Sequence, residues 1–167
     1  ADGDINEVGP RTYKELSAGD MIYYNLNIKG EIDTIRIGYD YNTGNAFNCG
    51  RGDDFYAPEN AGKRAIAVNS TWAGAAVSKV GSGIKISIKD KPEDINYDDF
   101  ESVQKTLKAF RLTNANAILV AEPNGSQFNV RKGSVDDIIT YEDTGEYDNV
   151  LVMTYWSSGQ YGTVIYK

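Results

Sequence analysis

Histidine is absent from this sequence of 167 residues, and Cys49 is its only cysteine. Histidine is the commonest general base and transition-metal ligand in proteins, and a single cysteine cannot form a disulfide within the chain. These absences exclude the usual serine, cysteine and zinc hydrolases. We therefore expect a protein that is not an enzyme and that has no catalytic residues and no cofactor.

Basic residues are also scarce, and no long apolar run is present. The chain has 17 lysines and arginines against 24 aspartates and glutamates, a formal net charge of -7, so nucleic acid and anionic membranes should repel it on average. No stretch reaches the roughly 18 apolar residues that a membrane helix needs. We expect neither a nucleic-acid partner nor membrane insertion. The 12 tyrosines favour half-exposed strand faces and contacts between proteins.

Short runs that alternate apolar and polar residues dominate the sequence. Residues 20–27 (DMIYYNLN) and 32–41 (IDTIRIGYDY) flank a turn at Lys29 and Gly30, which predicts a β-hairpin. The predicted fold class is mostly β, a barrel or sandwich of short antiparallel strands. Further strands are predicted at residues 64–69, 75–80, 84–89, 117–121, 127–131, 138–141, 148–157 and 163–166.

Two segments depart from this pattern. Apolar residues recur at helical spacing behind an acidic pair at positions 98 and 99, which predicts one short helix over residues 99–109, packed on an open sheet edge. Residues 42–62 are rich in glycine, asparagine and aspartate, so we expect one long surface loop there. The expected organisation is a single β-rich domain over residues 11–167, preceded by an N-terminal strand within residues 1–10.

Internal similarity is the most informative feature of the sequence. Residues 17–24 (SAGDMIYY) are echoed by residues 134–141 (SVDDIITY), and a similar second strand follows each, which suggests two related hairpins that frame the domain. Residues 2–8 match the second half of the first hairpin, although their own first strand would lie before residue 1. The backbone of such a strand needs a pairing partner. We therefore expect Ile5 and Val8 to contact a neighbouring copy.

Several of these segments resemble a known family. Residues 133–141 (GSVDDIITY), the strand at 148–152 and the terminal VIYK resemble β-rich repeat modules of clostridial-type (Firmicute) bacterial cell-surface proteins, which often carry S-layer homology domains. The hairpin at residues 18–35 resembles the same modules. The resemblance implies a place on a bacterial envelope, or on a phage particle that uses the module, and a role in spacing or assembly. It implies no catalytic residues.

The long loop contains Arg51-Gly52-Asp53, the tripeptide that integrins bind. Such tripeptides arise often by chance, so a glycine-rich turn is the preferred interpretation. Within the loop we take Arg51, Asp53 and Tyr56 as candidate contact residues. The nearby Cys49 is interpreted as a small hydrophobic side chain, with an intermolecular disulfide as the alternative.

The N-terminal segment carries a weak calcium candidate. Asp2, Asp4 and Asn6 alternate as the oxygen ligands of a calcium loop do, but Glu7 and Tyr13 break the pattern of an EF-hand. A hairpin turn explains the same residues and is preferred. We therefore assign no metal site and keep calcium as an alternative.

The leading functional hypothesis is a non-catalytic structural module that self-associates in a bacterial surface layer, filament or other extracellular assembly. Its expected partners are identical subunits or tandem neighbouring copies, at an extracellular or cell-surface location. A carbohydrate-binding or adhesive module is one alternative, because Trp72 and Trp156 could stack on cell-wall or surface glycans, although core packing is the commoner fate of tryptophan. A structural or decoration protein of a phage virion is another.

Overall fold

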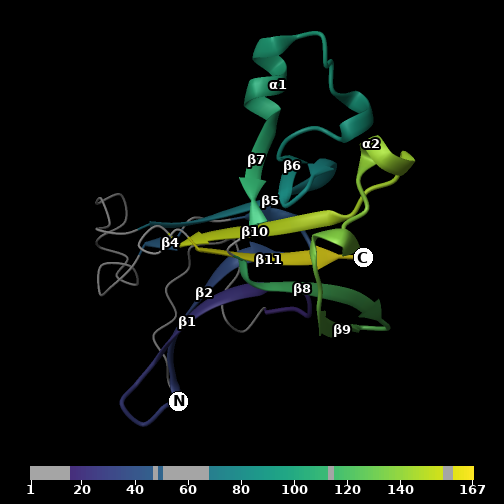
Figure 1. Cartoon of the computed structure of the whole chain (residues 1–167). Coiled ribbons are helices and arrows are strands. Elements are labelled where there is room, and N and C mark those ends of the chain that lie inside the picture. The colour runs from purple at the N-terminus through teal and green to yellow at the C-terminus, as the bar shows by residue number, and fades with distance from the viewer. Residues whose placement is uncertain (1–15, 47–48, 51–67, 113–114, 156–159) are drawn as a thin grey trace. The chain divides into compact units, whose positions relative to one another are not determined.

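The computed structural model describes residues 16–46, 49–50, 68–112, 115–155 and 160–167. Its chain divides into two compact units: Ala1–Thr71 with Thr154–Ser158, and Trp72–Met153 with Gly159–Lys167. Strands make up about half of the structure and only one helix reaches seven residues (Figure 1). The predicted mostly-β fold class is confirmed.

The first unit contains the predicted hairpin. Strands β1 (Met21–Leu26) and β2 (Ile32–Asp40) pair antiparallel, and β3 (Asn45–Ala46) extends this sheet beyond β2. The turn between β1 and β2 contains Gly30 at a φ of 78°, a left-handed conformation that glycine adopts without strain. The alternating pattern and the turn chemistry together explain why the sequence located this hairpin correctly.

Asp20 forms hydrogen bonds that connect the two chain segments at the end of the hairpin opposite its turn. The Asp20 carboxylate accepts a hydrogen bond of 2.8 Å from the Ser17 backbone N–H and one of 2.9 Å from the Tyr41 N–H. These contacts join the residues before β1 to those after β2. The neighbouring side chains of Ile37, Tyr39 and Asp40 are buried.

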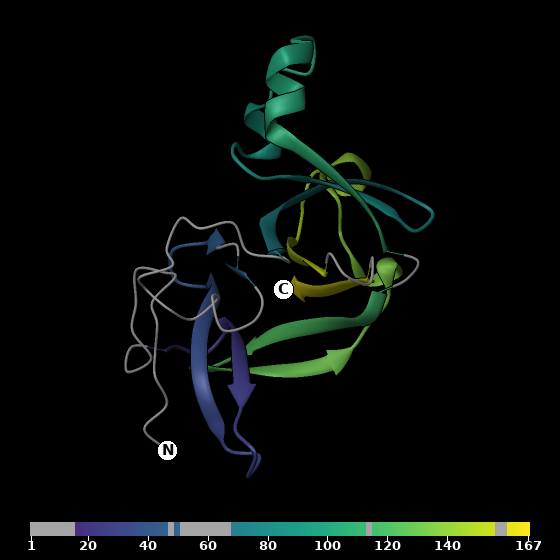
Figure 2. The same ribbon diagram turned by 90° about the vertical axis from the view of Figure 1, so that its left-hand side faces the viewer.

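The second unit is built on a larger sheet with the strand order β7-β6-β5-β10-β11-β8-β9. The beginning of β5, which falls within the first unit, pairs with β4. Strands β5, β6 and β7 form an antiparallel meander, and β8 with β9 forms a hairpin (Figure 2). The bounds are β4 (Cys49–Gly50), β5 (Val68–Val80), β6 (Gly83–Ser87), β7 (Leu107–Arg111), β8 (Ala115–Asn124), β9 (Gln127–Lys132), β10 (Asn149–Tyr155) and β11 (Gln160–Tyr166).

This topology corrects two details of the predicted fold. The sheet has open ends at β7 and β9, so it does not close into a barrel. Nor are its strands all short and antiparallel: β5 spans 13 residues, and β11 runs parallel to β8. Both features depend on which distant strands meet, and local alternation carries no information about that.

The core of this unit lies on the central strands. Val150, Leu151 and Val152 are consecutive in β10 and all are 0–1% exposed, so this strand is covered on both faces. Side chains from strands β5, β6, β8 and β11, one residue just after β7 and one before α2 form a cluster with Val150 and Val152. They are Ala76, Ile84, Ile86, Leu112, Val120, Ile138 and Ile165.

The single longer helix, α1 (Phe100–Thr106), is shorter than predicted. Asp99 caps it as expected, because its carboxylate accepts from the Glu101 and Ser102 backbone N–H groups. The chain then becomes β7, which pairs with β6 from Leu107 onward. Leu107 and Phe110 have helical spacing from Phe100 but lie in that strand, and Phe100 itself is 73% exposed. The predicted packing of a helix to residue 109 on a sheet edge is therefore wrong.

The predicted strand at residues 138–141 is also absent. A 3-10 turn (Val135–Asp137) precedes it, and a short helix α2 (Tyr141–Thr144) follows. The similarity to residues 17–24 lies instead in the turn, because Ser134 N–H donates to the Asp137 carboxylate at 2.8 Å, just as Ser17 N–H donates to Asp20. Two related capping turns exist, but the second is not the start of a hairpin.

The predicted long loop is partly described. Residues 42–45 are exposed, as expected, but the two-residue strands β3 and β4 interrupt the segment. Residues 47–48 and 51–62 of the predicted loop lie outside the described residues, as does the N-terminal strand predicted within residues 1–10.

Candidate functional site

Most of the predicted site residues lie outside the described part of the chain. They are the calcium candidates Asp2, Asp4 and Asn6 and the contact candidates Ile5, Val8, Arg51, Asp53 and Tyr56. Cys49 lies in β4, where its backbone pairs with Asn69. Within the described ranges, no three acidic or cysteine side chains gather where they could hold a metal ion. No helix of these ranges is long and apolar enough to span a membrane.

Trp72 is a structural side chain in this fold. It is half-buried, its ring centroid lies 6.4 Å from that of Phe110, and it packs against the hydrophobic core. The Lys108 ammonium stands 5.3 Å from the ring centroid, as in a cation–π contact. A sugar stacking on this ring would compete with Lys108. The other candidate, Trp156, lies outside the described residues.

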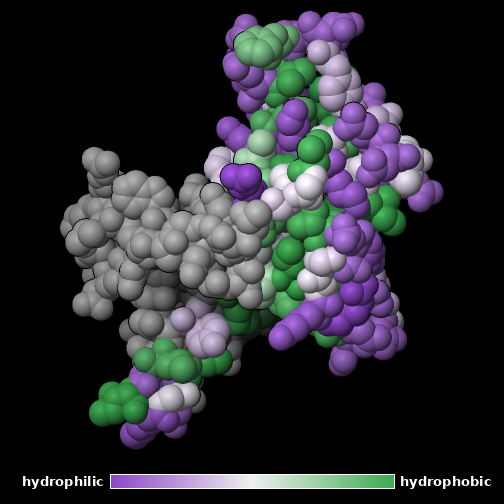
Figure 3. Space-filling view, viewed as in Figure 1, coloured by the Kyte–Doolittle hydropathy of each residue, from purple (hydrophilic) through white to green (hydrophobic). Residues whose placement is uncertain are grey.

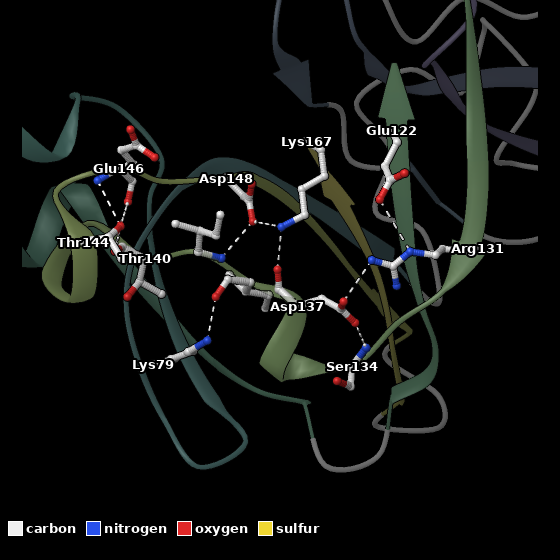
Figure 4. Close-up of polar contacts among 12 residues, drawn as sticks. Lys79, Glu122, Arg131, Ser134, Asp137, Thr140, Thr144, Glu146, Asp148 and Lys167 are labelled. Atoms are coloured by element: carbon white, nitrogen blue, oxygen red, sulfur yellow. Dashed lines mark hydrogen bonds and ion pairs between the residues drawn. The ribbon is translucent and has the colours of Figure 1, made fainter. Parts of the chain in front are cut away.

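The best-connected polar cluster centres on Asp148, whose side chain is 7% exposed (Figure 4). Its carboxylate accepts from the Lys167 ammonium at 2.7 Å and from the Ile139 backbone N–H at 2.8 Å. The Lys167 ammonium also donates to the Asp137 carbonyl at 2.6 Å, and Lys79 donates to the Ile138 carbonyl at 2.6 Å. Lys79 in β5 and Lys167, which directly follows β11, thus bind the backbone of the segment between β9 and β10.

A second ion pair extends this cluster at the surface. The Arg131 guanidinium donates to Asp137 at 3.0 Å and lies 3.5 Å from Glu122. Its hydrogen bond to Asp137, together with the Ser134 N–H bond, lowers the pKa of the Asp137 carboxyl below its ordinary value. These charged groups bind one another and the backbone. The arrangement stabilises residues 134–148 against the sheet.

An open groove on the second unit is a better candidate for a binding site than the polar cluster around Asp148. It has a volume of about 530 Å³ and is lined by the β5–β6 turn, the end of β7, the beginning of β8 and the segment after β9. Leu112, Ile118, Leu119 and Val135 give it an apolar floor. Its volume falls within the range of about 300–1,000 Å³ that is usual for binding sites.

The rim of the groove carries charges of both signs. Lys132 and Asp136 line it and are exposed. Their neighbours Arg131 and Asp137 form an ion pair with each other, but neither rim residue forms an ion pair with another residue of the described ranges. The two rim charges are therefore available to a partner.

The end of the β1–β2 hairpin is the other unusual surface. Ile28 is 102% exposed, and Leu26 and Ile32 beside it are 52% and 42% exposed. Hydrophobic side chains gather there in Figure 3. We call Leu26, Ile28 and Ile32, with the exposed Lys29 and Glu31 between them, the hairpin tip.

The hairpin tip is held in a defined conformation. The Asn27 side-chain oxygen accepts from the Lys29 N–H at 2.9 Å and the Glu31 N–H at 3.1 Å, and its amide donates to the Glu31 carboxylate at 3.0 Å. The Asn27 backbone N–H also donates to the Glu31 carbonyl at 2.9 Å. This turn therefore presents Ile28 to the solvent instead of allowing it to fold back.

The edge strands differ in charge. Strands β7 and β9, at the two ends of the larger sheet, carry Lys108 and Arg111, and Arg131 and Lys132. Basic residues on an edge discourage pairing with another sheet. Strand β1, an edge of the smaller sheet among the described strands, has the sequence MIYYNL and no charged residue, glycine or proline. It is the edge least protected against an added strand.

Neither the groove nor the hairpin tip is among the sites that the sequence predicts. The signal for the hairpin tip was present, because an isoleucine between Asn27 and Lys29 in a predicted turn must face solvent. The groove left no such signal, since its lining comes from segments that are far apart in the chain.

No family model matches the chain, and neither a curated protein nor a solved structure matches it.

Proposed function

We propose that this chain is a non-catalytic structural module that self-associates in a bacterial surface layer, filament or other extracellular assembly. The observation that supports this proposal is strand β1, an uncharged edge among the described strands, which runs directly into the hairpin tip with its exposed apolar side chains. Soluble proteins usually protect such edges with charge, and exposed apolar patches mark contact sites. The bacterial surface location rests on the resemblance of the sequence to clostridial-type surface modules.

The N-terminal residues supply a candidate for the pairing strand. In this proposal Ile5 and Val8 belong to a strand that pairs with the sheet edge of a neighbouring copy. Strand β1 is a suitable acceptor because charge does not protect its edge. Each added backbone hydrogen bond contributes about 0.5–1.5 kcal/mol net, so a short strand can support association when its apolar side chains are also covered.

The proposal is tested by placing a charge on the β1 edge. Tyr24 is 55% exposed in β1, and we expect Tyr24→Lys to lower the mass measured by light scattering. The matched control is Val130→Lys, which changes a 60% exposed residue on the already basic β9. Circular dichroism of both variants verifies that they fold.

A second variant examines the donor strand itself. Deleting residues 1–10 should abolish association through this strand and leave the circular dichroism spectrum of the remaining chain unchanged. A truncated chain that associates as strongly as the intact chain, or that unfolds as a monomer, would contradict the donor-strand proposal. Binding on a glycan array without any self-association would favour the carbohydrate-binding alternative instead.

A further inference from the structure

We infer that the hairpin tip of one copy inserts into the groove of a second copy of this chain. This inference rests on the proposed self-association and adds a second contact to the strand pairing at β1. Ile28 at the end of the tip is fully exposed. The contact would cover the apolar groups of Leu26, Ile28 and Ile32, which are otherwise left in water.

The two surfaces match in their apolar character. The tip offers branched aliphatic side chains on a turn that Asn27 fixes. The groove offers Leu112, Ile118, Leu119 and Val135 as a floor, in an open volume of about 530 Å³. Because the tip is already ordered, inserting it costs less conformational entropy than ordering a flexible segment would.

Their charges also match in arrangement. The tip places Lys29 and Glu31 on either side of Gly30, and the groove rim carries Lys132 and Asp136. Seating the apolar tip in the groove allows Lys29 to meet Asp136 while Glu31 meets Lys132. Opposite charges around an apolar centre are the usual arrangement of a specific interface and determine its register.

The chemistry of the groove favours this occupant over a nucleic acid or an anionic ligand. Its rim has one acid and one base, so an anionic ligand finds no local excess of positive charge there. A second copy supplies both the apolar group and the complementary pair.

The geometry has a consequence for assembly. The tip and the groove are different surfaces, so each copy can use one of each. Reciprocal insertion closes a two-fold dimer, whereas one-way insertion continues from copy to copy and produces rings or filaments. Growth beyond a dimer would therefore indicate one-way insertion.

The first test removes the apolar group of the tip. We expect Ile28→Asp to weaken the association constant about 10- to 100-fold in sedimentation equilibrium, the effect of uncovering one aliphatic side chain. The matched control is Phe100→Asp, which removes another exposed apolar side chain at the start of α1, where an acid suits the helix. This control should associate as the unaltered chain does.

The second test exchanges the charges and needs no change to the core. Lys29→Glu with Glu31→Lys should weaken association about tenfold, and so should Lys132→Glu with Asp136→Lys. Combining all four substitutions restores opposite charges and should return the constant to within about threefold of its original value. Circular dichroism should be unchanged throughout, because these side chains are exposed.

The outcomes separate the two proposals. If the unaltered chain associates but Ile28→Asp and both charge exchanges leave its constant unchanged, the tip and groove are not the interface, while self-association stands. If the variant with all four charge substitutions does not regain the original association constant, this pairing of charges is likewise contradicted. If the unaltered chain remains a monomer, the proposed function itself is wrong.

Discussion

Leu26 and Ile32 are paired directly across the β1–β2 hairpin, and both remain about half exposed. A cross-strand apolar pair stabilises a hairpin, but one this exposed also leaves apolar surface in contact with water. The pair lies next to Ile28, so the hairpin ends in a continuous apolar surface. Its conformation depends on Asn27, and the first prediction concerns that residue.

Replacing Asn27 with alanine should loosen the turn. The substitution removes the oxygen that accepts from the Lys29 and Glu31 N–H groups, at a cost of about 1 kcal/mol. Amide hydrogen exchange at these two positions should accelerate. Asn27→Asp is the control, since it keeps the accepting oxygen and should preserve most of the protection. Equal protection in the alanine variant and the unaltered chain would show that the turn is stable without the side chain.

The Asp148–Lys167 pair should be important for stability, because Asp148 is buried. Lys167→Met leaves that carboxylate without its ammonium partner, and we expect a loss of about 2 kcal/mol in the free energy of unfolding. Urea titration followed by circular dichroism measures this loss. Lys105→Met is the control: its ion pair with Glu101 is 70% and 77% exposed, so the change should cost less than about 0.5 kcal/mol. Equal effects of the two substitutions would be inconsistent with this account.

The folded chain should lose stability in acid through Asp137. The pKa of its carboxyl is lowered in the folded state by Arg131 and by the Ser134 N–H, so the ionised form favours folding. This contribution is fully present above the unfolded pKa, which is about 4, and is lost as the pH falls through the lower, folded-state pKa.

Arg131→Gln should raise the Asp137 pKa toward its ordinary value and reduce this acid dependence. Carboxyl carbon chemical shifts, followed by NMR as the pH is lowered, report the pKa directly. The control is Lys132→Gln, which removes the adjacent cation and should leave the Asp137 titration nearly unchanged. An Asp137 pKa that does not move in the Arg131 variant would contradict the assigned cause.

Gly74 should tolerate no side chain. A Cβ atom built there would lie 2.0 Å from the Ser87 carbonyl oxygen on the neighbouring strand, and that oxygen belongs to the backbone. Gly74→Ala should therefore destabilise the fold by at least about 2 kcal/mol, because β5 and β6 must separate locally. At Gly83, a Cβ would approach no atom closer than 3.3 Å. Gly83→Ala should therefore lower the melting temperature clearly less than Gly74→Ala does, when thermal unfolding of both variants is measured. A reversed order of the two melting temperatures would count against the close approach of these strands.

The features that the sequence predicted correctly depend on neighbouring residues. Alternation and the glycine turn defined the β1–β2 hairpin, and Asp99 marked the start of α1. The wrong predictions concern segments whose secondary structure depends on contacts with distant parts of the chain. Leu107 continues a helical spacing, yet pairing with β6 draws it into a strand. Residues 138–141 have the composition of a strand, but the Ile139 N–H donates to Asp148 and not to a neighbouring strand.

The same distinction applies to the candidate surfaces. The exposure of Ile28 could have been predicted from the sequence, because this residue lies within a predicted turn and its neighbours are charged or polar. The groove could not, since Leu112, Ile118 and Val135 come together only when three separate segments meet. Their apolar side chains look like ordinary core residues in the sequence.

Self-association is the central claim, and sedimentation velocity over a wide range of concentrations tests it most directly. The chain has a mass of 18.4 kDa. We expect species at multiples of this mass, growing beyond the dimer as the concentration rises, with rings or filaments visible by negative-stain electron microscopy of the same samples. A single 18.4 kDa species at every concentration, with no assemblies on the grid, would contradict the account.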